Sequence, residues 1–175
     1  ITYNKGFKMK KKILLVEDEA LIALSEAKTL QKNGFEVVTA LDGEDAVEKA
    51  VHDSDISLIL MDIDLGEGID GTTAAQEILE KRELPIVFLT SHSEKEYVDK
   101  VKEITRYGYI LKKSGEFVLI ETINMAYNLF EANKKTKTYA RRLLLTEYES
   151  EKRRKYLEAT LGSVPVAIIT GDHQG

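Results

Sequence analysis

Acidic, hydroxyl and ammonium side chains follow four short apolar runs of this sequence. The residues after these runs are Glu17 and Asp18, then Asp62 with Asp64 two positions on, then Thr90 and Ser91, then Lys112 and Lys113. Three converging carboxylates repel one another unless a cation lies among them, and hard oxygen ligands with room for water suit Mg²⁺. A hydroxyl and an ammonium group facing them suit the oxygens of a phosphoryl group. Asp62 leaves a fully apolar run, so its carboxylate would be fixed and available as a nucleophile.

Each of these residues also has an ordinary structural role. A lone acid after a strand is more often a helix N-cap than a ligand, and Thr90 and Ser91 could equally cap a following helix. A lone Lys112 would usually be a surface lysine. Matching chemistry at four run ends, and not at one, favours a common site. The three histidines are scattered without metal-ligand spacing, which argues against a histidine metal site.

The elements that must position these residues alternate along the chain. We expect strands at 13–17, 35–40, 56–61, 85–89 and 107–111, and helices at 19–33, 44–52, 72–82 and 94–104. Leu21, Leu24, Ala27 and Leu30 are predicted to form the apolar face of the first helix, which ends at Gly34. This alternation predicts an α/β fold with a doubly wound five-stranded parallel sheet. Ligands of such sheets bind beyond the carboxyl ends of the strands.

Composition narrows the class of protein. The chain has 175 residues, 43% hydrophobic and 31% charged, as in globular domains. Because it has no cysteine, a disulfide framework, a thiol nucleophile and a cysteine zinc site are excluded. Apolar runs of about six residues fall short of the ~20 needed to cross a bilayer, and no secretory leader is recognised, so we expect a cytoplasmic protein. The net charge is −5, and the acidic body disfavours nucleic acid as a partner.

A long helix is predicted after Gly115. Residues 116–161 contain neither Pro nor Gly, enough for one helix of about 70 Å. Its first turns are apolar, but further on the heptad stripe is broken by polar residues. A parallel dimeric coiled coil is favoured over a solvated helix without a partner, because a long helix gains little stability without packing. The basic residues of this segment, Arg141, Arg142, Arg153 and Arg154, precede no clean zipper, which disfavours a DNA-binding helix.

Several motifs together resemble the receiver domain of two-component response regulators. They are Leu14-Leu15-Val16-Glu17-Asp18-Glu19, Leu58-Ile59-Leu60-Met61-Asp62-Ile63-Asp64-Leu65, Asp70-Gly71, Phe88-Leu89-Thr90-Ser91 and Tyr109-Ile110-Leu111-Lys112. The resemblance runs from residue 11 to about 130. It implies a flavodoxin-like (βα)5 fold, here with an extended C-terminal helix, and a regulatory phosphoacceptor with slow self-dephosphorylation instead of a conventional enzyme.

The resemblance also implies a role for each site residue. Asp62 matches the aspartate that accepts the phosphoryl group, and Glu17, Asp18, Asp62 and the backbone carbonyl of Asp64 match the Mg²⁺ ligands. Thr90, Ser91 and Lys112 correspond to the phosphate-binding positions, and Thr90 and Tyr109 to the switch pair. The implied partner is a histidine kinase or a phosphotransfer protein. A homodimer would use the face of helix four, strand five and helix five, together with the long helix; no nucleic acid or membrane contact is expected.

The sequence departs from the family pattern at three places. Lys113 stands where the family commonly has a proline, so we expect a trans bond there. Gly66-Glu67-Gly68 replaces another frequent proline, which predicts a more mobile loop after the third strand. Asp64 and His92 flank the path of an attacking water, and we hypothesise that they tune the phosphoryl lifetime.

The two ends of the chain suggest further segments. We predict a basic N-terminal extension at 1–10, the receiver domain at 11–130, a linker or coiled-coil helix at 131–161, and the truncated start of a PAS-like domain at 162–175. The last assignment rests on residues 157–169, which resemble the helix and opening strand of a PAS sensory domain. On this interpretation the chain is the N-terminal piece of a larger sensory protein or hybrid histidine kinase.

Two rival functions remain at this stage. Asp62-Ile63-Asp64 resembles the Asp-x-Asp pair of haloacid-dehalogenase phosphatases, but that family usually places the pair on its first strand. A non-phosphorylated interaction module, in which the coiled coil is the active part, is the other alternative. A phosphatase would turn over substrate, a receiver would retain phosphate, and an interaction module would do neither.

Overall fold

A five-stranded parallel sheet is the centre of the fold. The computed structural model describes residues 11–91, 104–105 and 107–162. Its elements are β1 (Lys12–Val16), α1 (Ala20–Lys32), β2 (Glu36–Ala40), α2 (Gly43–His52), β3 (Ile56–Asp62), α3 (Gly71–Lys81), β4 (Ile86–Thr90), β5 (Tyr109–Leu111) and α5 (Gly115–Gly162). The strand order is β2-β1-β3-β4-β5. The predicted doubly wound α/β fold is confirmed, whereas the helix expected at 94–104 falls almost wholly outside the described residues.

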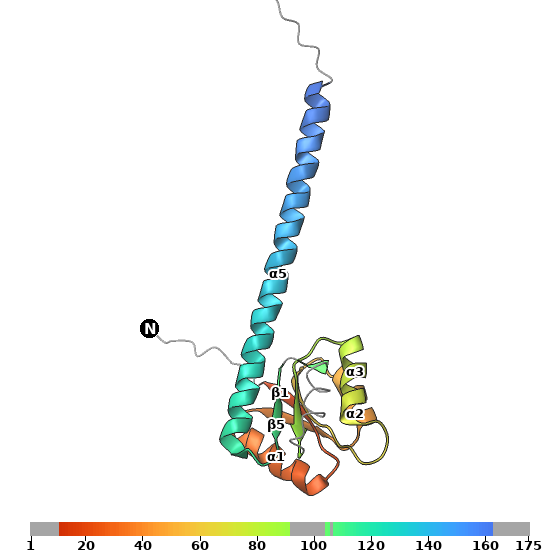
Figure 1. Cartoon of the computed structure of the whole chain (residues 1–175), viewed down its shortest axis with the longest axis vertical. Helices are drawn as coiled ribbons and strands as arrows, with labels where there is room; N and C mark the ends of the chain where they lie inside the picture. The colour runs from red at the N-terminus through yellow and green to blue at the C-terminus, as the bar shows by residue number, and fades with distance from the viewer. Residues whose placement is uncertain (1–10, 92–103, 106, 163–175) are drawn as a thin grey trace, which may run out of the picture. The chain divides into compact units, whose positions relative to one another are not determined.

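Apolar layers cover both faces of the sheet. On one face, β-strand residues pack against α2 and α3 through small side chains such as Ala46, Ala50 and Ala74. On the other face, the partners are α1 and the first turns of α5, through Leu30, Ile123 and Tyr127 among others (Figure 1). Central strands buried on both faces are largely apolar, which is why residues 58–61 of β3 and 86–89 of β4 are continuous apolar runs, and the one polar residue inside β3, Ser57, is only partly buried.

Short polar residues fix where two of the helices begin. The Asp42 carboxylate accepts a hydrogen bond from the Asp45 N–H and caps α2, and the Asp70 carboxylate does the same for α3 through the Thr73 N–H. The apolar face predicted for α1 was partly wrong. Ala23, Ala27 and Leu30 are buried, whereas Leu21 and Leu24 are 84% and 53% exposed. Small alanines let α1 approach the sheet closely, and the two leucines fall on its outer side.

Helix α5 confirms the long helix predicted from the absence of Gly and Pro. The chain divides into two compact units between Ala132 and Asn133, within this helix. In the first unit, Ile123, Ala126 and Tyr127 are buried against the sheet. In the second unit every residue of 133–161 is exposed except Asn133. Its large apolar side chains are Tyr139, Leu143, Leu144, Leu145, Tyr148, Tyr156, Leu157 and Leu161. None of the helices in the described part of the chain has an apolar stretch of the length that a bilayer requires.

Candidate functional site

The predicted site residues meet at the carboxyl edge of the sheet. Glu17 follows β1, Asp62 and Thr90 are the last residues of β3 and β4, and Lys112 follows β5. The strand register brings them together, because Asp62 pairs with Leu89 and Thr90 with Leu111. Beyond the last register pair, the Lys112 N–H donates to the Thr90 carbonyl at 2.9 Å. Four strand ends thus supply one crevice, as the sequence predicted.

Lys112 bridges the two buried acids of this crevice. Its Nζ lies 2.6 Å from Glu17 Oε2 and 2.6 Å from Asp62 Oδ2. Glu17 is fully buried and Asp62 is only 3% exposed. An ammonium group between two such carboxylates neutralises one of their two charges, so the crevice still carries an excess negative charge.

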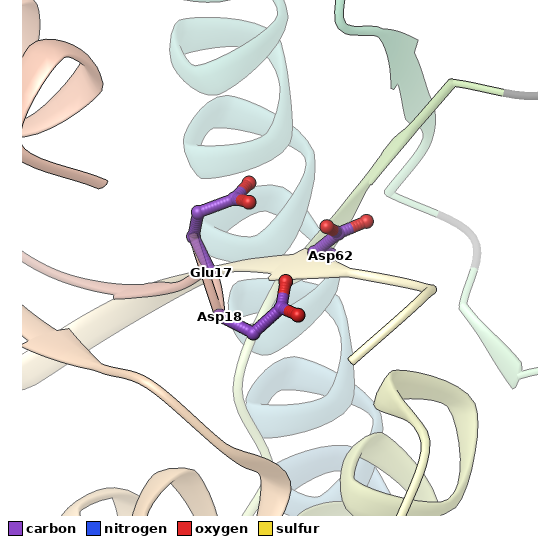
Figure 2. Close-up of side chains that lie close together, drawn as sticks. All are labelled: Glu17, Asp18 and Asp62. Atoms are coloured by element: carbon purple, nitrogen blue, oxygen red, sulfur yellow. The ribbon is translucent and has the colours of Figure 1, made fainter. Parts of the chain in front are cut away.

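The three acids also form a donor set for a cation. One carboxylate oxygen each from Glu17, Asp18 and Asp62 lie within 4.8 Å of one another, and Figure 2 shows the three side chains at the same edge. Glu17 Oε1 is buried and has no hydrogen-bond partner in the described structure. A buried carboxylate oxygen without a donor, beside two further hard oxygen ligands, fits Mg²⁺. Asp18, by contrast, is exposed, so water can complete the coordination.

The protonation equilibria follow from burial and from Lys112. Burial raises the pKa of Asp62 and of Glu17 above their ordinary values, and the Lys112 ammonium acts in the opposite direction on both. For Lys112 burial favours the neutral form, but the hydrogen bonds with Asp62 and Glu17 outweigh it and raise the pKa of the lysine. Lys112 is therefore a permanent cation here. A second cation in the crevice would favour ionisation of both acids.

Of the remaining predicted residues, Thr90 is buried and the others that the structure describes are partly or fully exposed. Thr90 is 1% exposed, whereas Ser91 is exposed and Tyr109 is 38% exposed. Lys113 follows Lys112 through a trans bond, as expected. Asp64 is exposed, and its N–H donates to Asp62 Oδ1 at 3.3 Å. His92 lies outside the described residues.

Helix α3 begins in direct contact with the Asp62 backbone. A Cβ atom on Gly71 would lie 1.8 Å from the Asp62 carbonyl oxygen, so only glycine fits. The Gly71 N–H donates to the Ile63 carbonyl at 3.0 Å and closes the segment 63–70 at its base. The position of Asp62 is thus fixed by the sheet on one side and by α3 on the other.

Sequence reasoning missed one acid near the crevice, Glu26 of α1. Burial raises the pKa of Glu26 to about 7, with the Glu17 charge adding to the effect and Lys112 opposing it. Its Oε2 is buried without a partner among the described residues, and it lines a pocket of about 160 Å³ together with Lys112 and Glu116. The signal was present in the spacing, because Glu26 lies three residues after Ala23 and four before Leu30, on the buried face of α1.

Comparisons with known proteins agree with this geometry. Residues 13–124 match the family of response regulator receiver domains. The transcriptional regulatory protein PdtaR of Mycobacterium tuberculosis is 38% identical over 122 residues, which are 69% of this chain and 58% of PdtaR. This chain therefore spans little more than half the length of that relative.

Solved structures show the same fold. The N-terminal domain of a response regulator/sensory box/GGDEF three-domain protein from Carboxydothermus hydrogenoformans is 50% identical, with a TM-score of 0.66 over 70% of this chain and 98% of that one. A CheY-like receiver domain protein from Methanospirillum hungatei, 24% identical with a TM-score of 0.66 over 71% of this chain and 98% of that one, shares the flavodoxin-like fold. These matches leave the phosphatase alternative without support.

Proposed function

The chain belongs to the response regulator receiver family, and from this premise we propose that Asp62 accepts a phosphoryl group from a histidine kinase or a phosphotransfer protein. Receiver domains are regulatory phosphoacceptor modules and not conventional enzymes. The observation that carries the proposal is the crevice itself, in which Lys112 contacts the buried Asp62 and Glu17 at 2.6 Å each. A structural ion pair alone would not need a second buried acid with an oxygen left without a donor.

The transfer step needs a nucleophile, charge neutralisation and positioning. An Asp62 carboxylate oxygen attacks the phosphorus atom of a phosphohistidine, the new P–O bond forms and the P–N bond breaks, with its electron pair remaining on the imidazole nitrogen. Lys112, already hydrogen-bonded to Asp62 Oδ2, stabilises the negative charge that moves onto the aspartate. Glu17, Asp18, Asp62 and the Asp64 carbonyl would hold Mg²⁺, which supplies further neutralisation of the phosphoryl oxygens.

The switch would follow from the new charge on Asp62. A phosphoryl group adds a charge near −2 and strong acceptor oxygens. The Thr90 hydroxyl, at the end of the neighbouring strand, would donate to one of these oxygens, with Ser91 beside it at the rim. Movement of Thr90 leaves space that Tyr109, now 38% exposed, would enter. Such a switch requires two packings that differ by only a few kcal/mol.

The long helix would carry the output. We assign residues 131–161 as a coiled-coil linker to a PAS-like segment that starts at 162, in a cytoplasmic sensory protein or hybrid histidine kinase. Support comes from the exposed apolar side chains of α5 beyond Ala132, and from the presence of a sensory box in the related C. hydrogenoformans protein. A homodimer would use this helix and the face around β5. The same exposed side chains favour the second candidate, an interaction module that works without phosphorylation.

Mass spectrometry separates the two candidates. The intact mass is measured after incubation with Mg²⁺ and acetyl phosphate, with Asp62→Asn as the matched control. One phosphoryl adduct on the unsubstituted chain, absent from Asp62→Asn and without Mg²⁺, is the expected result. No adduct on a folded chain would contradict the phosphoacceptor function and leave the interaction module.

A further inference from the structure

The segment that connects β3 to α3 is held by a side chain from outside the acidic crevice. Residues 63–70 carry Asp64, the proposed carbonyl ligand, and contain the glycines that predicted a mobile loop. Three of its backbone N–H groups nevertheless have carboxylate acceptors. One is the Asp64 N–H, which donates to Asp62 Oδ1 within the crevice. The Gly66 N–H donates to Asp18 Oδ2 at 3.2 Å, and the Ile69 N–H donates to Glu44 Oε1 at 3.2 Å.

The Glu44 carboxylate lies close to the backbone of Gly68, and the start of α2 lies close to Ile69. Gly68 has φ +90°, and a Cβ atom there would lie 2.5 Å from Glu44 Oε2. On the helix side, a Cβ on Gly43 would lie 2.5 Å from the Ile69 Cγ1 and 2.6 Å from its carbonyl oxygen. The first turn of α2 therefore lies directly against this segment. Gly43 has no room for a side chain, and the positive φ of Gly68 favours glycine there.

The two carboxylates differ in what else they would bind. Asp18 belongs to the proposed Mg²⁺ ligands, so the carboxylate that accepts from the Gly66 N–H is one that the cation would also use. Glu44 is exposed on α2 and is not one of the clustered acids, so its bond to the Ile69 N–H does not depend on the cation. The bond with Glu44 can therefore restrain the segment with or without the cation, in addition to the buried side chains of Ile63 and Leu65.

We propose that Glu44 is a positioning residue, which holds the β3–α3 segment so that the Asp64 carbonyl is oriented for Mg²⁺ binding. The inference rests on the proposed function and deepens it. A metal ligand on a loop must be held within a fraction of an ångström, and outer partners that do so raise metal affinity. The family commonly has a proline after the third strand, which restrains the backbone. In this chain the hydrogen bond that the Ile69 N–H donates to the Glu44 carboxylate of α2 supplies a restraint in its place.

Three variants separate the hydrogen bond from charge. Glu44→Ala removes the acceptor and the charge, and Glu44→Gln removes the charge but retains a carbonyl oxygen. Glu48→Ala is the matched control, because it removes the same charge from an exposed position one turn along α2. The Mg²⁺ dissociation constant is measured by isothermal titration calorimetry, and the hydrogen exchange of the Ile69 amide by NMR without metal.

We expect Glu44→Ala to weaken Mg²⁺ binding by about three- to tenfold and to speed the exchange of the Ile69 amide by a similar factor, which is the size of one net hydrogen bond. Glu44→Gln and Glu48→Ala should stay within about twofold of the unsubstituted chain. Equal Mg²⁺ affinity in Glu44→Ala and Glu48→Ala, or equal losses in Glu44→Ala and Glu44→Gln, would overturn this inference alone. Absence of Mg²⁺ binding by the unsubstituted chain would overturn the proposed metal site and this inference with it.

Discussion

The carboxyl and amino edges of the same sheet differ in how completely their charged side chains are paired. At the carboxyl edge, the buried Glu17 and Asp62 share one cation, Lys112, and Glu17 Oε1 has no donor among the described residues. At the amino edge, the Lys12 ammonium lies 2.7 Å from Asp53 Oδ2, and the Arg82 guanidinium is surrounded by acceptors. One edge leaves charge unsatisfied and the other pairs it.

Arg82 shows how complete the pairing is at the amino edge. Its Nη1 donates to the carbonyls of Ala50 and Asp53, and its Nη2 to those of Ser54 and Ile56, all at 2.6–2.8 Å. One side chain thus joins the ends of α2 and α3 to the start of β3. The guanidinium of Arg82 is therefore fully used in hydrogen bonds, whereas the carboxyl edge has two buried acids for one ammonium group. The carboxyl edge keeps an excess of negative charge that a bound cation would neutralise.

The largest loss of stability is expected when the shared ammonium group of Lys112 is removed. Lys112→Met leaves Glu17 and Asp62 buried without a partner, so we expect the free energy of unfolding to fall by about 3–5 kcal/mol at pH 7.5. The pKa of both carboxyl groups, already raised by burial, would rise further without the ammonium. Urea unfolding at pH 7.5 and at pH 5 measures the effect.

The loss of stability in Lys112→Met should depend on pH in a definite direction. A carboxyl group whose folded pKa is raised takes up a proton in the native state first, so stability is regained as the pH falls toward that pKa. The deficit relative to the unsubstituted chain should therefore shrink at pH 5, and also on addition of Mg²⁺. A deficit that is the same at both pH values would show that lost packing, and not unpaired charge, causes it.

At the other edge, Arg82→Met should be nearly as costly. Four carbonyls lose a charged donor, and we expect a loss on the order of 2–4 kcal/mol in the free energy of unfolding. Thermal and urea unfolding measure it, with Arg82→Lys as control, because a single ammonium cannot reach all four oxygens. Full stability in Arg82→Lys would contradict the claim that the guanidinium geometry matters. Unlike Lys112→Met, this loss should not depend on pH or Mg²⁺.

Neutralising Glu26, a further acid near the crevice, should increase the stability of the chain. Burial raises the pKa of Glu26 to about 7, so the folded chain favours the protonated carboxyl group. The free energy of unfolding therefore falls as the pH rises from about 4.5 to 7 and Glu26 becomes ionised. Glu26→Gln should be more stable than the unsubstituted chain by about 1–2 kcal/mol at pH 8, after allowance for solvent screening, and equal to it at pH 4.5. Melting temperatures across this range test it, and a gain that is independent of pH would contradict it.

The smallest expected effect is again at the amino edge. The Ser57 hydroxyl donates to the Lys12 carbonyl at 3.0 Å, so the Tyr127 hydroxyl, 2.9 Å from Ser57 Oγ, is the donor of that pair. Burial raises the pKa of Tyr127 to about 12, in keeping with a protonated phenol. Tyr127→Phe should cost about 0.5–1.5 kcal/mol at neutral pH. Chemical unfolding measures the cost. We expect the Mg²⁺ affinity to stay unchanged, and a change would show that the two edges are coupled.

Features that depend on a local residue pattern could be predicted from the sequence. Asp62 ends a run that is apolar on both faces, so its place at a strand end followed from residue type alone. The long helix followed from the absence of Gly and Pro after Gly115. Because the carboxyl ends of parallel strands share one edge of the sheet, the meeting of Glu17, Asp62, Thr90 and Lys112 followed from the order of strands and helices.

Tertiary partners could not be predicted in the same way. Periodicity says which side of α1 is apolar, but the choice between Leu24 and Ala23 depends on how closely the helix approaches the sheet. The four acceptors of Arg82 are backbone carbonyls, which carry no residue-specific signal. The bond from Glu44 to the Ile69 N–H depends equally on backbone geometry, at a segment where the sequence suggested only mobility.

The charged contacts at the two edges join residues at very different separations along the chain, and this bears on the order of folding events. Arg82 reaches acceptors 26 to 32 residues earlier in the chain, so its bonds close short loops within the segment from α2 to α3. Lys112 contacts Glu17 across 95 residues, and that bond forms only when the whole sheet is assembled. Substitution of Arg82 should therefore slow refolding, whereas substitution of Lys112 should mainly accelerate unfolding, as the two arms of a chevron plot would report. Such a result would mean that the acidic crevice forms late in folding and opens early in unfolding.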